Sequence, residues 1–220
     1  METFKEYFED YEVIEKSLSP DLNRDQVFKA GEGAGRSGSF FFFSYDNKFI
    51  IKTVSKDELK LFLEMLPAMA DHYKRNPHSL IAKHFGAFTV KTDSTNEVHL
   101  VLMENTLQLK NKDGLDFIFD LKGSLVDRKV TGKTTSSTTL KDVNFLIATE
   151  ASKKFIDLED ATRKKLLQVV NNDVKFLSGL GLMDYSLLLG IETLQNEDVN
   201  LLSSNFSTTV HQMGSNRMAV

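Results

Sequence analysis

The feature that most constrains the fold is a glycine-rich segment that leads into two apolar runs. The stretch GEGAGRSGSFFFFSYDNKFIIKTV, residues 31–54, contains SFFFFSY, the turn dipeptide Asp46-Asn47, and KFIIKTV with its β-branched residues. Two such runs on either side of a turn predict a β-hairpin. Glycines ahead of a strand also let backbone amides approach a phosphate, because no side chains intervene. An ordinary flexible lead into the hairpin is the alternative interpretation.

The segments behind this hairpin alternate between helix and strand. Ser55 and Glu58 have the spacing of a capping box, and the apolar residues of LKLFLEML after them fall at helical spacing. Pro67 is expected to open a separate helical segment, PAMADHYKRN, which ends before Pro77. HFGAFTVKT and EVHLVLMEN then read as two strands around a polar turn.

Two polar or interrupted segments lie outside these strands. Residues 1–29 read as a helical lead-in that is broken at Ser19-Pro20. Residues 131–140, TGKTTSSTTL, have few side chains to bury and predict a mobile loop.

The second half of the chain is mainly helical. A long helical pattern covers residues 150–180, beginning near Asp160 and ending near Gly179, and MDYSLLLGI then returns to a strand. After Ile191 no period is convincing, so an irregular tail is expected. The whole pattern is α+β: an antiparallel sheet with helices, followed by a helical second part.

Composition narrows the class of protein. With 220 residues, of which 41% are hydrophobic and 26% charged, the chain suits one large domain or two lobes that share a cleft. The absence of Cys excludes disulfides and thiolate zinc sites, and it fits a reducing compartment. The sequence shows neither a signal peptide nor 18 consecutive apolar residues, so any membrane contact is expected to be peripheral.

The distribution of charge points to an anionic ligand. A net charge of −4 argues against nucleic-acid binding. Lys122, Arg128, Lys129 and Lys133 nevertheless cluster near mid-chain, around the motif FDLKGSLVDR. A local basic site on an acidic protein suits an anion, and a solvated lysine-rich loop is the alternative.

Lys52 is a candidate ligand for phosphate. It lies in FIIKT, a strand of the buried type directly after the glycine-rich hairpin, where an unpaired ammonium is costly. Kinases use a glycine loop and a lysine on a nearby strand in this order to hold the phosphates of ATP. Glu58 and Glu64 on the next helix are its candidate ion-pair partners, and Glu64 is the freer because Glu58 is expected to cap the helix.

Two further segments carry candidate chemistry. The strand in LVLMENTL ends at Met103-Glu104-Asn105, where backbone groups could face an adenine edge. Asp184 stands where a long helix gives way to an apolar strand, and a carboxylate held there could accept or orient the proton of a hydroxyl. An acid that merely caps a turn is the alternative.

Five blocks of the sequence together resemble the phosphatidylinositol phosphate kinases, in order and in register, from about residue 3 to residue 192. They are GRSGSFFFFSYDNKFIIKT, MLPAMADHYKRNPHSLIAKHFGAF, FDLKGSLVDR, TLKDVNFL and MDYSLLLGI. DLKGS followed by Arg128, and MDYSLL, are the most specific of them. The resemblance implies a kinase-like two-lobed α+β fold, with an antiparallel N-lobe sheet, helices and an incomplete C-lobe. It implies one catalytic domain over residues 1–220, with the N-lobe over about 1–110, a partial C-lobe over about 111–192 and an irregular tail over 193–220.

The resemblance also implies roles for individual residues. Asp184 corresponds to the catalytic aspartate and Lys52 to the phosphate-gripping lysine. Lys122 and Arg128 correspond to a basic pair that binds the substrate near the transferred phosphate. The nucleotide-binding residues implied by the resemblance are Gly35, Ser37, Gly38, Ser39, Lys52, Met103, Asn105 and Leu107.

The activity implied by the resemblance is transfer of the γ-phosphate of ATP to a phosphoinositide hydroxyl, with ATP and Mg²⁺ as cofactors. Phosphatidylinositol 4-phosphate, converted to the 4,5-bisphosphate, is the expected substrate. The expected location is cytoplasmic and peripheral on the cytosolic face of a membrane, in contact with the phosphoinositide lipid. A homodimer formed through the first 50 residues is compatible with the sequence, and no nucleic-acid partner is expected.

The sequence departs from kinase patterns in two places. Protein kinases have a metal-holding Asn five residues after the catalytic Asp, where this chain has Leu189. The resembling family has a second, magnesium-binding acid in an I-I-D context and then a basic activation loop, and none of Glu192, Glu197 and Asp198 fits that acid. We therefore expect no metal residue in this chain and a C-terminal truncation of the family pattern. The alternative function is an impaired module that binds nucleotide or phosphoinositide.

Overall fold

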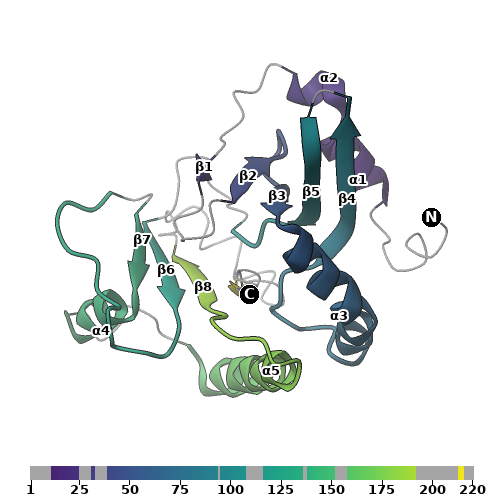
Figure 1. Cartoon of the computed structure of the whole chain (residues 1–220). Coiled ribbons are helices and arrows are strands. Elements are labelled where there is room, and N and C mark those ends of the chain that lie inside the picture. Colours follow the sequence, from purple (N-terminus) through teal and green to yellow (C-terminus); the bar gives the residue numbers. More distant parts are fainter. Residues whose placement is uncertain are drawn as a thin grey trace. The chain divides into compact units, whose positions relative to one another are not determined.

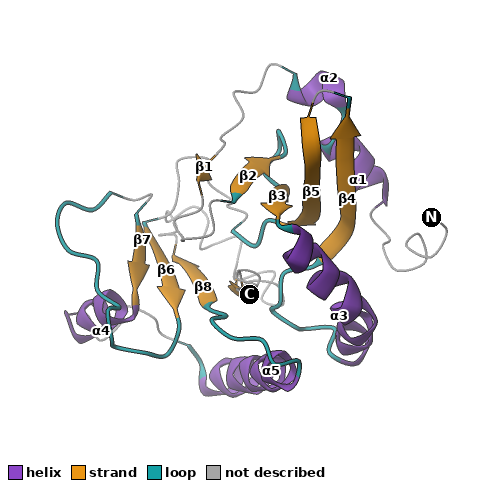
Figure 2. Ribbon diagram, viewed as in Figure 1, coloured by secondary structure: helices purple, strands orange, loops and turns teal. Residues whose placement is uncertain are grey.

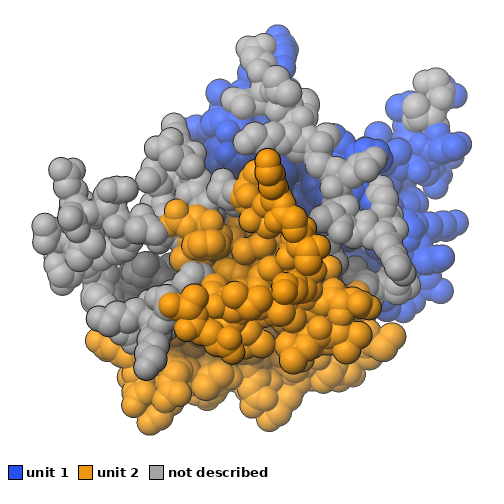
Figure 3. Space-filling view, turned by 90° about the vertical axis from the view of Figure 1, so that its left-hand side faces the viewer, with its two compact units in different colours: residues 1–67, 82–108 blue, residues 68–81, 109–220 orange. Residues whose placement is uncertain are grey.

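The structure is a computed structural model, and it describes residues 11–24, 31–32, 39–93, 95–107, 116–135, 138–151, 158–191 and 213–215. The chain forms helices and two β-sheets, which confirms the predicted α+β class (Figures 1 and 2). It divides into two compact units (Figure 3), residues 1–67 with 82–108 and residues 68–81 with 109–220. Residues 68–81 thus belong to the second unit, although they precede the lobe boundary expected near residue 110.

Unit 1 is built on a five-stranded sheet in the order β1-β2-β3-β5-β4, with every neighbouring pair antiparallel. The strands are β1 (Gly31–Glu32), β2 (Phe40–Phe43), β3 (Phe49–Val54), β4 (His84–Thr92) and β5 (Thr95–Glu104). The predicted hairpin is β2–β3, and β4 has the predicted bounds. The core of this unit contains Ile50, Ala82 and Met103, with Phe41 and Phe43 packed against them.

The turn between β2 and β3 is held by a network around Asp46. Its carboxylate accepts hydrogen bonds from the hydroxyls of Ser44 and Ser17, each at 2.7 Å. Burial alone would raise the pKa of Asp46, but these bonds, the backbone amide of Lys48 and the Lys48 charge outweigh burial and lower it. Because Ser17 ends helix α1 (Tyr11–Ser17), the network also ties the lead-in to the sheet.

The lead-in and the first long helix follow the expected start signals. Helix α1 is followed by α2 (Pro20–Asn23), so the predicted break at Ser19-Pro20 is confirmed. Helix α3 (Lys56–Arg75) begins at the predicted capping box. The Ser55 amide donates to Glu58 Oε2 at 2.6 Å, and the Glu58 amide donates to Ser55 Oγ at 3.1 Å.

The prediction that Pro67 opens a separate helix is wrong, because Pro67 lies inside α3. A proline in a helix interior removes one backbone hydrogen bond and crowds the preceding turn. The helix continues because buried side chains anchor it on both sides of the proline. They fall at helical spacing: Phe62, Met65, Met69 and His72, each at most 5% exposed.

Unit 2 is built on a four-stranded sheet in the order β7-β6-β8-β9. The strands are β6 (Phe117–Leu121), β7 (Thr139–Lys141), β8 (Leu187–Ile191) and β9 (Met213–Ser215). The β6–β7 pair is parallel and the other two pairs are antiparallel. Helix α4 (Asp142–Ala151) follows β7, and helix α5 (Asp160–Gly179) precedes β8.

Several predictions for unit 2 can be compared with these elements. The helix from Asp160 to Gly179 and the strand in MDYSLLLGI are confirmed. Residues 131–140 were expected to be loop throughout, yet their last two residues belong to β7, which pairs with β6. The tail was expected to be irregular, yet residues 213–215 extend the sheet beside β8. In both cases long-range pairing creates a strand that local periodicity does not indicate.

The interior of unit 2 has an aromatic centre and a polar one. Phe119 of β6 is fully buried and meets Phe145 of α4 edge-on, with ring centroids 5.2 Å apart. Asp173 of α5 accepts hydrogen bonds from His72 Nε2 at 2.7 Å, from Ser79 Oγ and from the Leu80 amide. This carboxylate therefore fixes residues 72–80 to α5 within the unit.

Candidate active site

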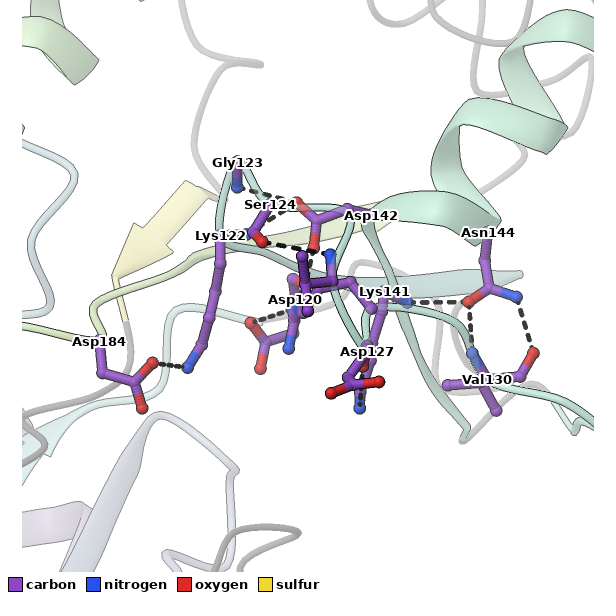
Figure 4. Close-up of polar contacts among 12 residues, drawn as sticks. Asp120, Lys122, Gly123, Ser124, Asp127, Val130, Lys141, Asp142, Asn144 and Asp184 are labelled. Carbon is purple, nitrogen blue, oxygen red and sulfur yellow. Dashed lines mark hydrogen bonds and ion pairs between the residues drawn. The ribbon is translucent and has the colours of Figure 1, made fainter.

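The sheet of unit 2 brings Lys122 and Asp184 together. Lys122 directly follows β6, and Asp184 lies in the loop between α5 and β8. Because β6 and β8 are antiparallel neighbours, with Leu121 opposite Leu187, the end of one strand lies beside the start of the other. The Lys122 ammonium points toward the Asp184 carboxylate and forms an ion pair with it (Figure 4).

The two members of this pair differ in exposure. The Lys122 side chain is only 16% exposed, whereas the Asp184 side chain is 54% exposed. Asp184 has φ +63°, in the left-handed region that Asp tolerates better than most residues. Because the Asp184 side chain is exposed, a ligand can reach its carboxylate directly. An ammonium and a carboxylate so placed can neutralise phosphate charge and orient the proton of a hydroxyl.

A buried carboxylate, Asp142, holds the loop that carries Lys122. Asp142 Oδ1 accepts hydrogen bonds from the backbone amides of Lys122 at 2.9 Å and Gly123 at 2.8 Å. Asp142 Oδ2 accepts a bond from Arg128 Nε at 2.8 Å. Arg128 Nη2 also donates to the carboxylate of Asp120 at 3.1 Å and to its backbone carbonyl oxygen. The start and the end of the loop, residues 122–128, are thus fixed at the first residue of α4.

These charges are buried and mutually stabilising. Burial alone would raise the pKa of Asp142, but the Arg128 guanidinium and the backbone amides outweigh burial and lower it. For Arg128, burial alone would lower the pKa, and the Asp142 and Asp120 carboxylates outweigh it and raise it. The side chains of all three residues are at most 11% exposed.

The predicted basic pair is divided between two sets of contacts. Lys122 meets Asp184, while Arg128 meets Asp120 and Asp142. Sequence reasoning missed Asp142 as a site residue and missed α4 as an element. The available signal was an acid directly before the apolar run of VNFLIA, the position where a helix favours negative charge.

Lys52 lies in the middle strand of unit 1. It pairs with Phe41 of β2 and Val101 of β5, and its Nζ lies 5.9 Å from the centre of the Phe41 ring. Burial, assisted by the Lys52 charge, lowers the pKa of His84 on β4 to about 4, so that His84 is neutral at physiological pH. Its buried Nδ1 has no hydrogen-bond partner in the described part of the chain.

The expected ion-pair partners of Lys52 occupy different environments. Glu58 belongs to the capping box of α3, as the sequence predicts. Glu64 is exposed on the same helix. Pairing of Lys52 with Glu64 stays a prediction.

The residues expected to bind nucleotide are only partly described. Ser39 is buried directly before β2, while Gly35, Ser37 and Gly38 lie outside the described residues. Met103 is buried in the core of unit 1. The backbone amide of Asn105 donates a hydrogen bond to the Lys48 carbonyl oxygen at 2.9 Å. Its side-chain Nδ2 donates to the Asn47 carbonyl oxygen at 2.7 Å.

The strand end expected to face an adenine edge uses its amides within the protein. The Glu104 amide donates to the Lys83 carbonyl at 2.8 Å, and the Leu107 amide donates to Asn105 Oδ1 at 3.1 Å. Together with the Asn105 amide, three donors of this segment are engaged. Adenine contacts by Met103, Asn105 and Leu107 stay a prediction.

Among the described residues, no group of three or more His, Asp or Glu side chains forms an arrangement that could hold a metal ion. Glu192, Glu197 and Asp198 lie outside the described part of the chain. None of the described helices combines the length and apolar character needed to cross a membrane.

Comparison with known proteins decides the family. A family model described as phosphatidylinositol-4-phosphate 5-kinase matches residues 22–219. The chain belongs to this kinase family. It is 41% identical over 181 residues to a probable phosphatidylinositol phosphate kinase from Dictyostelium discoideum, covering 78% of this chain and 24% of that protein. The family resemblance drawn from the five sequence blocks is thereby confirmed.

Two further relatives of this phosphatidylinositol-4-phosphate 5-kinase family member extend the comparison. Phosphatidylinositol 4-phosphate 5-kinase its3 from Schizosaccharomyces pombe is 36% identical over 176 residues, covering 79% of this chain and 23% of the relative. Phosphatidylinositol 4-phosphate 5-kinase type-1 beta from Gallus gallus is 35% identical over 164 residues, covering 74% of this chain and 29% of the relative. This chain spans about a quarter of the length of the curated relatives it matches.

Proposed function

We propose that this chain catalyses phosphorylation of a phosphoinositide by ATP, converting phosphatidylinositol 4-phosphate to the 4,5-bisphosphate. Membership of the family and the names of the relatives support the reaction class. The observation that carries the proposal is the ion pair of Lys122 and Asp184 at one edge of the unit 2 sheet. It supplies the two groups that transfer of a phosphoryl group to a hydroxyl requires, a cation for phosphate charge and a carboxylate for the proton.

The proposed step is an in-line displacement. The inositol hydroxyl oxygen attacks the γ-phosphorus of ATP, the bond from that phosphorus to the bridging oxygen breaks, and ADP leaves. Asp184 orients the hydroxyl and accepts its proton, which then passes to solvent. Lys122 stabilises the charge on the transferred group, and Lys52 binds the phosphates of ATP. Most of the rate enhancement then comes from positioning and charge stabilisation.

Magnesium enters this proposal with the nucleotide. Mg²⁺ in kinase sites is usually held by substrate phosphates and one or two carboxylates, so it does not need a cage of protein ligands. When bound, the ion supplies neutralisation of phosphate charge.

The substrate also implies a location. Because phosphatidylinositol 4-phosphate is a membrane lipid, we place the protein on the cytosolic face of a membrane, attached peripherally. The exposed lysines Lys129 and Lys133, which follow the loop in sequence, are suited to the surface of an anionic bilayer. A homodimer and the absence of a nucleic-acid partner belong to the same proposal.

A lipid kinase assay tests the function. Vesicles of phosphatidylcholine with phosphatidylinositol 4-phosphate are incubated with the chain, Mg²⁺ and ATP labelled in the γ position, and the lipids are separated. We expect labelled 4,5-bisphosphate from the wild-type chain and only background from Lys52→Met. If the chain binds ATP but no label appears in the lipid, the alternative of a binding module is favoured. If the chain showed no turnover and no ATP binding, the kinase and the nucleotide-binding module would both be contradicted.

A further inference from the structure

We propose that Asp142 is a positioning residue for the reaction, which acts by placing the Lys122 ammonium against Asp184. The inference rests on the proposed function, because it concerns the same Lys122–Asp184 pair. It adds a residue that holds the pair without being expected to touch substrate.

Both oxygens of the Asp142 carboxylate are engaged in hydrogen bonds. One oxygen receives two backbone amides, at 2.9 and 2.8 Å, and the other receives the Arg128 guanidinium at 2.8 Å. With both oxygens engaged, rotation of the carboxylate would break charge-assisted hydrogen bonds, which are about twice as strong as neutral ones. The group is therefore a fixed reference point at the start of α4.

The amides that bond to Asp142 lie at the residue that carries the ammonium and at the next residue. Lys122 is bonded through its own backbone amide, so the bond fixes the main chain at the residue whose side chain reaches Asp184 (Figure 4). The next residue, Gly123, has φ +71°, a conformation that side-chain-bearing residues rarely adopt, and its amide is also bonded to Asp142. The sharp turn and the two bonds together set the direction in which the Lys122 side chain leaves the backbone.

Arg128 connects Asp142 to the strand that precedes Lys122. Its guanidinium bridges Asp142 to Asp120 on β6, the strand that ends just before Lys122. The Val143 amide adds a bond to the Arg128 carbonyl at 3.0 Å. Arg128 thereby neutralises the buried Asp142 and ties the far end of the loop to the same carboxylate. In this proposal Arg128 contributes to the reaction by holding Asp142. The family resemblance implies a different role for Arg128, contact with the substrate headgroup.

A purely structural role for Asp142 predicts a different outcome from a positioning role. Loss of stability alone would weaken binding of every nucleotide to the same extent. Displacement of Lys122 would weaken binding of ATP more than that of ADP, because the ammonium is proposed to lie near the transferred phosphate. The ratio of the two affinities therefore separates the roles.

The experiment is a double-mutant cycle on the whole chain. MgATP and MgADP are titrated calorimetrically into the wild type, Asp142→Asn, Lys122→Met and the double variant, and the thermal midpoint of each is recorded. Asp142→Asn is isosteric, but its amide group would face the Arg128 guanidinium. The matched control is Asp127→Asn, which removes one negative charge from an exposed residue of the same loop.

We expect Asp142→Asn and Lys122→Met each to lower the ATP-to-ADP affinity ratio roughly tenfold, the size of one lost charge-assisted hydrogen bond. The double variant should lose no more than Lys122→Met alone, and Asp127→Asn should match the wild type. Equal losses for ATP and ADP, or additive losses in the double variant, would overturn the positioning role.

Two further outcomes are equally decisive. If Lys122→Met leaves the ratio unchanged, the role proposed for Lys122 fails and the inference fails with it. If Lys122→Met lowers the ratio and Asp142→Asn does not, only the inference fails. Should Asp142→Asn not fold, Arg128→Lys replaces it, since this change keeps the charge but removes the fork that holds Asp142. A selective loss for ATP would support the inference, and an equal loss for both nucleotides would overturn it.

Discussion

Asp184 combines a left-handed backbone, an exposed carboxylate and an ion pair with a largely covered lysine. Non-glycine residues adopt such a backbone at a cost and persist in it where the surrounding structure demands it. An aspartate that only capped a turn would need no ion pair with the lysine that directly follows β6. At the scale of single residues, Asp184 is therefore the residue to which we assign the proposed proton transfer.

The first prediction concerns this residue. Asp184→Asn should leave the affinity for MgATP within about threefold, because the proposed role of the carboxylate is toward the hydroxyl. It should reduce lipid phosphorylation by roughly a hundredfold or more, the usual contribution of a general base. The measurement is labelled-lipid formation beside calorimetric ATP binding. Wild-type turnover in the variant would remove Asp184 from the mechanism.

The sequence singles out candidate residues but does not indicate which of them contact one another. Lys122 and Asp184 were singled out from local motifs, and the structure joins them by an ion pair across 62 residues. Asp142 was missed because its role depends on amides about 20 residues away, which no local pattern reveals. The family resemblance implies that Arg128 binds the substrate, and this role stays a prediction. The structure shows the Arg128 guanidinium paired with Asp120 and Asp142.

At the scale of elements, strands and helices with strong local signals were predicted well. The capping box at Ser55 and Glu58, the hairpin turn at Asp46-Asn47 and the helix ending at Gly179 follow from short-range chemistry. Helix α3 shows the opposite case. Propensity at Pro67 predicted a break, but a buried apolar stripe on both sides outweighs one lost backbone bond. Strands β7 and β9 are short and owe their existence to pairing with neighbours.

The second prediction concerns the contact of α5 with residues 72–80 in unit 2. Asp173→Ala should lower the free energy of unfolding by roughly 2–4 kcal/mol, because three donors, including His72, would lose a buried acceptor. The measurement is urea denaturation at pH 7. The matched control is Asp160→Ala on the same helix, an exposed residue paired with Arg163. Asp160→Ala should lower the free energy of unfolding by less than about 1 kcal/mol. Equal losses in the two variants would contradict the account.

At the scale of the whole molecule, the chain divides into two units, each with its own sheet and core. Lys52 lies in unit 1, and the ion pair of Lys122 and Asp184 lies in unit 2. The family resemblance implies two lobes with a boundary near residue 110, and that boundary stays a prediction. The compact units of the structure divide near residue 108, with residues 68–81 in the second unit. Composition alone could not decide between one domain and two, since both bury a core of this size.

The third prediction concerns how the free energy of unfolding of the whole chain depends on pH because of His84. Its pKa is about 4 in the folded state against an ordinary value of 6.5, so between these values the unfolded chain binds a proton that the folded chain does not. Stability should therefore fall as pH is lowered through this window, by about 2–3 kcal/mol between pH 7.5 and 4.5. Urea denaturation at several pH values measures this effect.

The controls for this prediction use two variants. His84→Phe should remove most of the acid sensitivity, while His78→Phe, at an exposed position, should keep it. Asp46 and Asp142 have lowered pKa values, and their contributions are lost only below an ordinary value of 3.8, outside this window. An unchanged pH dependence in His84→Phe would show that another group is responsible.

The central claim is that this chain is a nucleotide-using member of its kinase family, and one calorimetric titration tests it most directly. MgATP is titrated into the wild type, into Lys52→Met and into the control Lys60→Met, which replaces an exposed lysine on α3. We predict that the wild type and the control bind ATP with the same affinity and that Lys52→Met loses binding. Equal affinity in all three proteins, or no binding in any of them, would contradict the account.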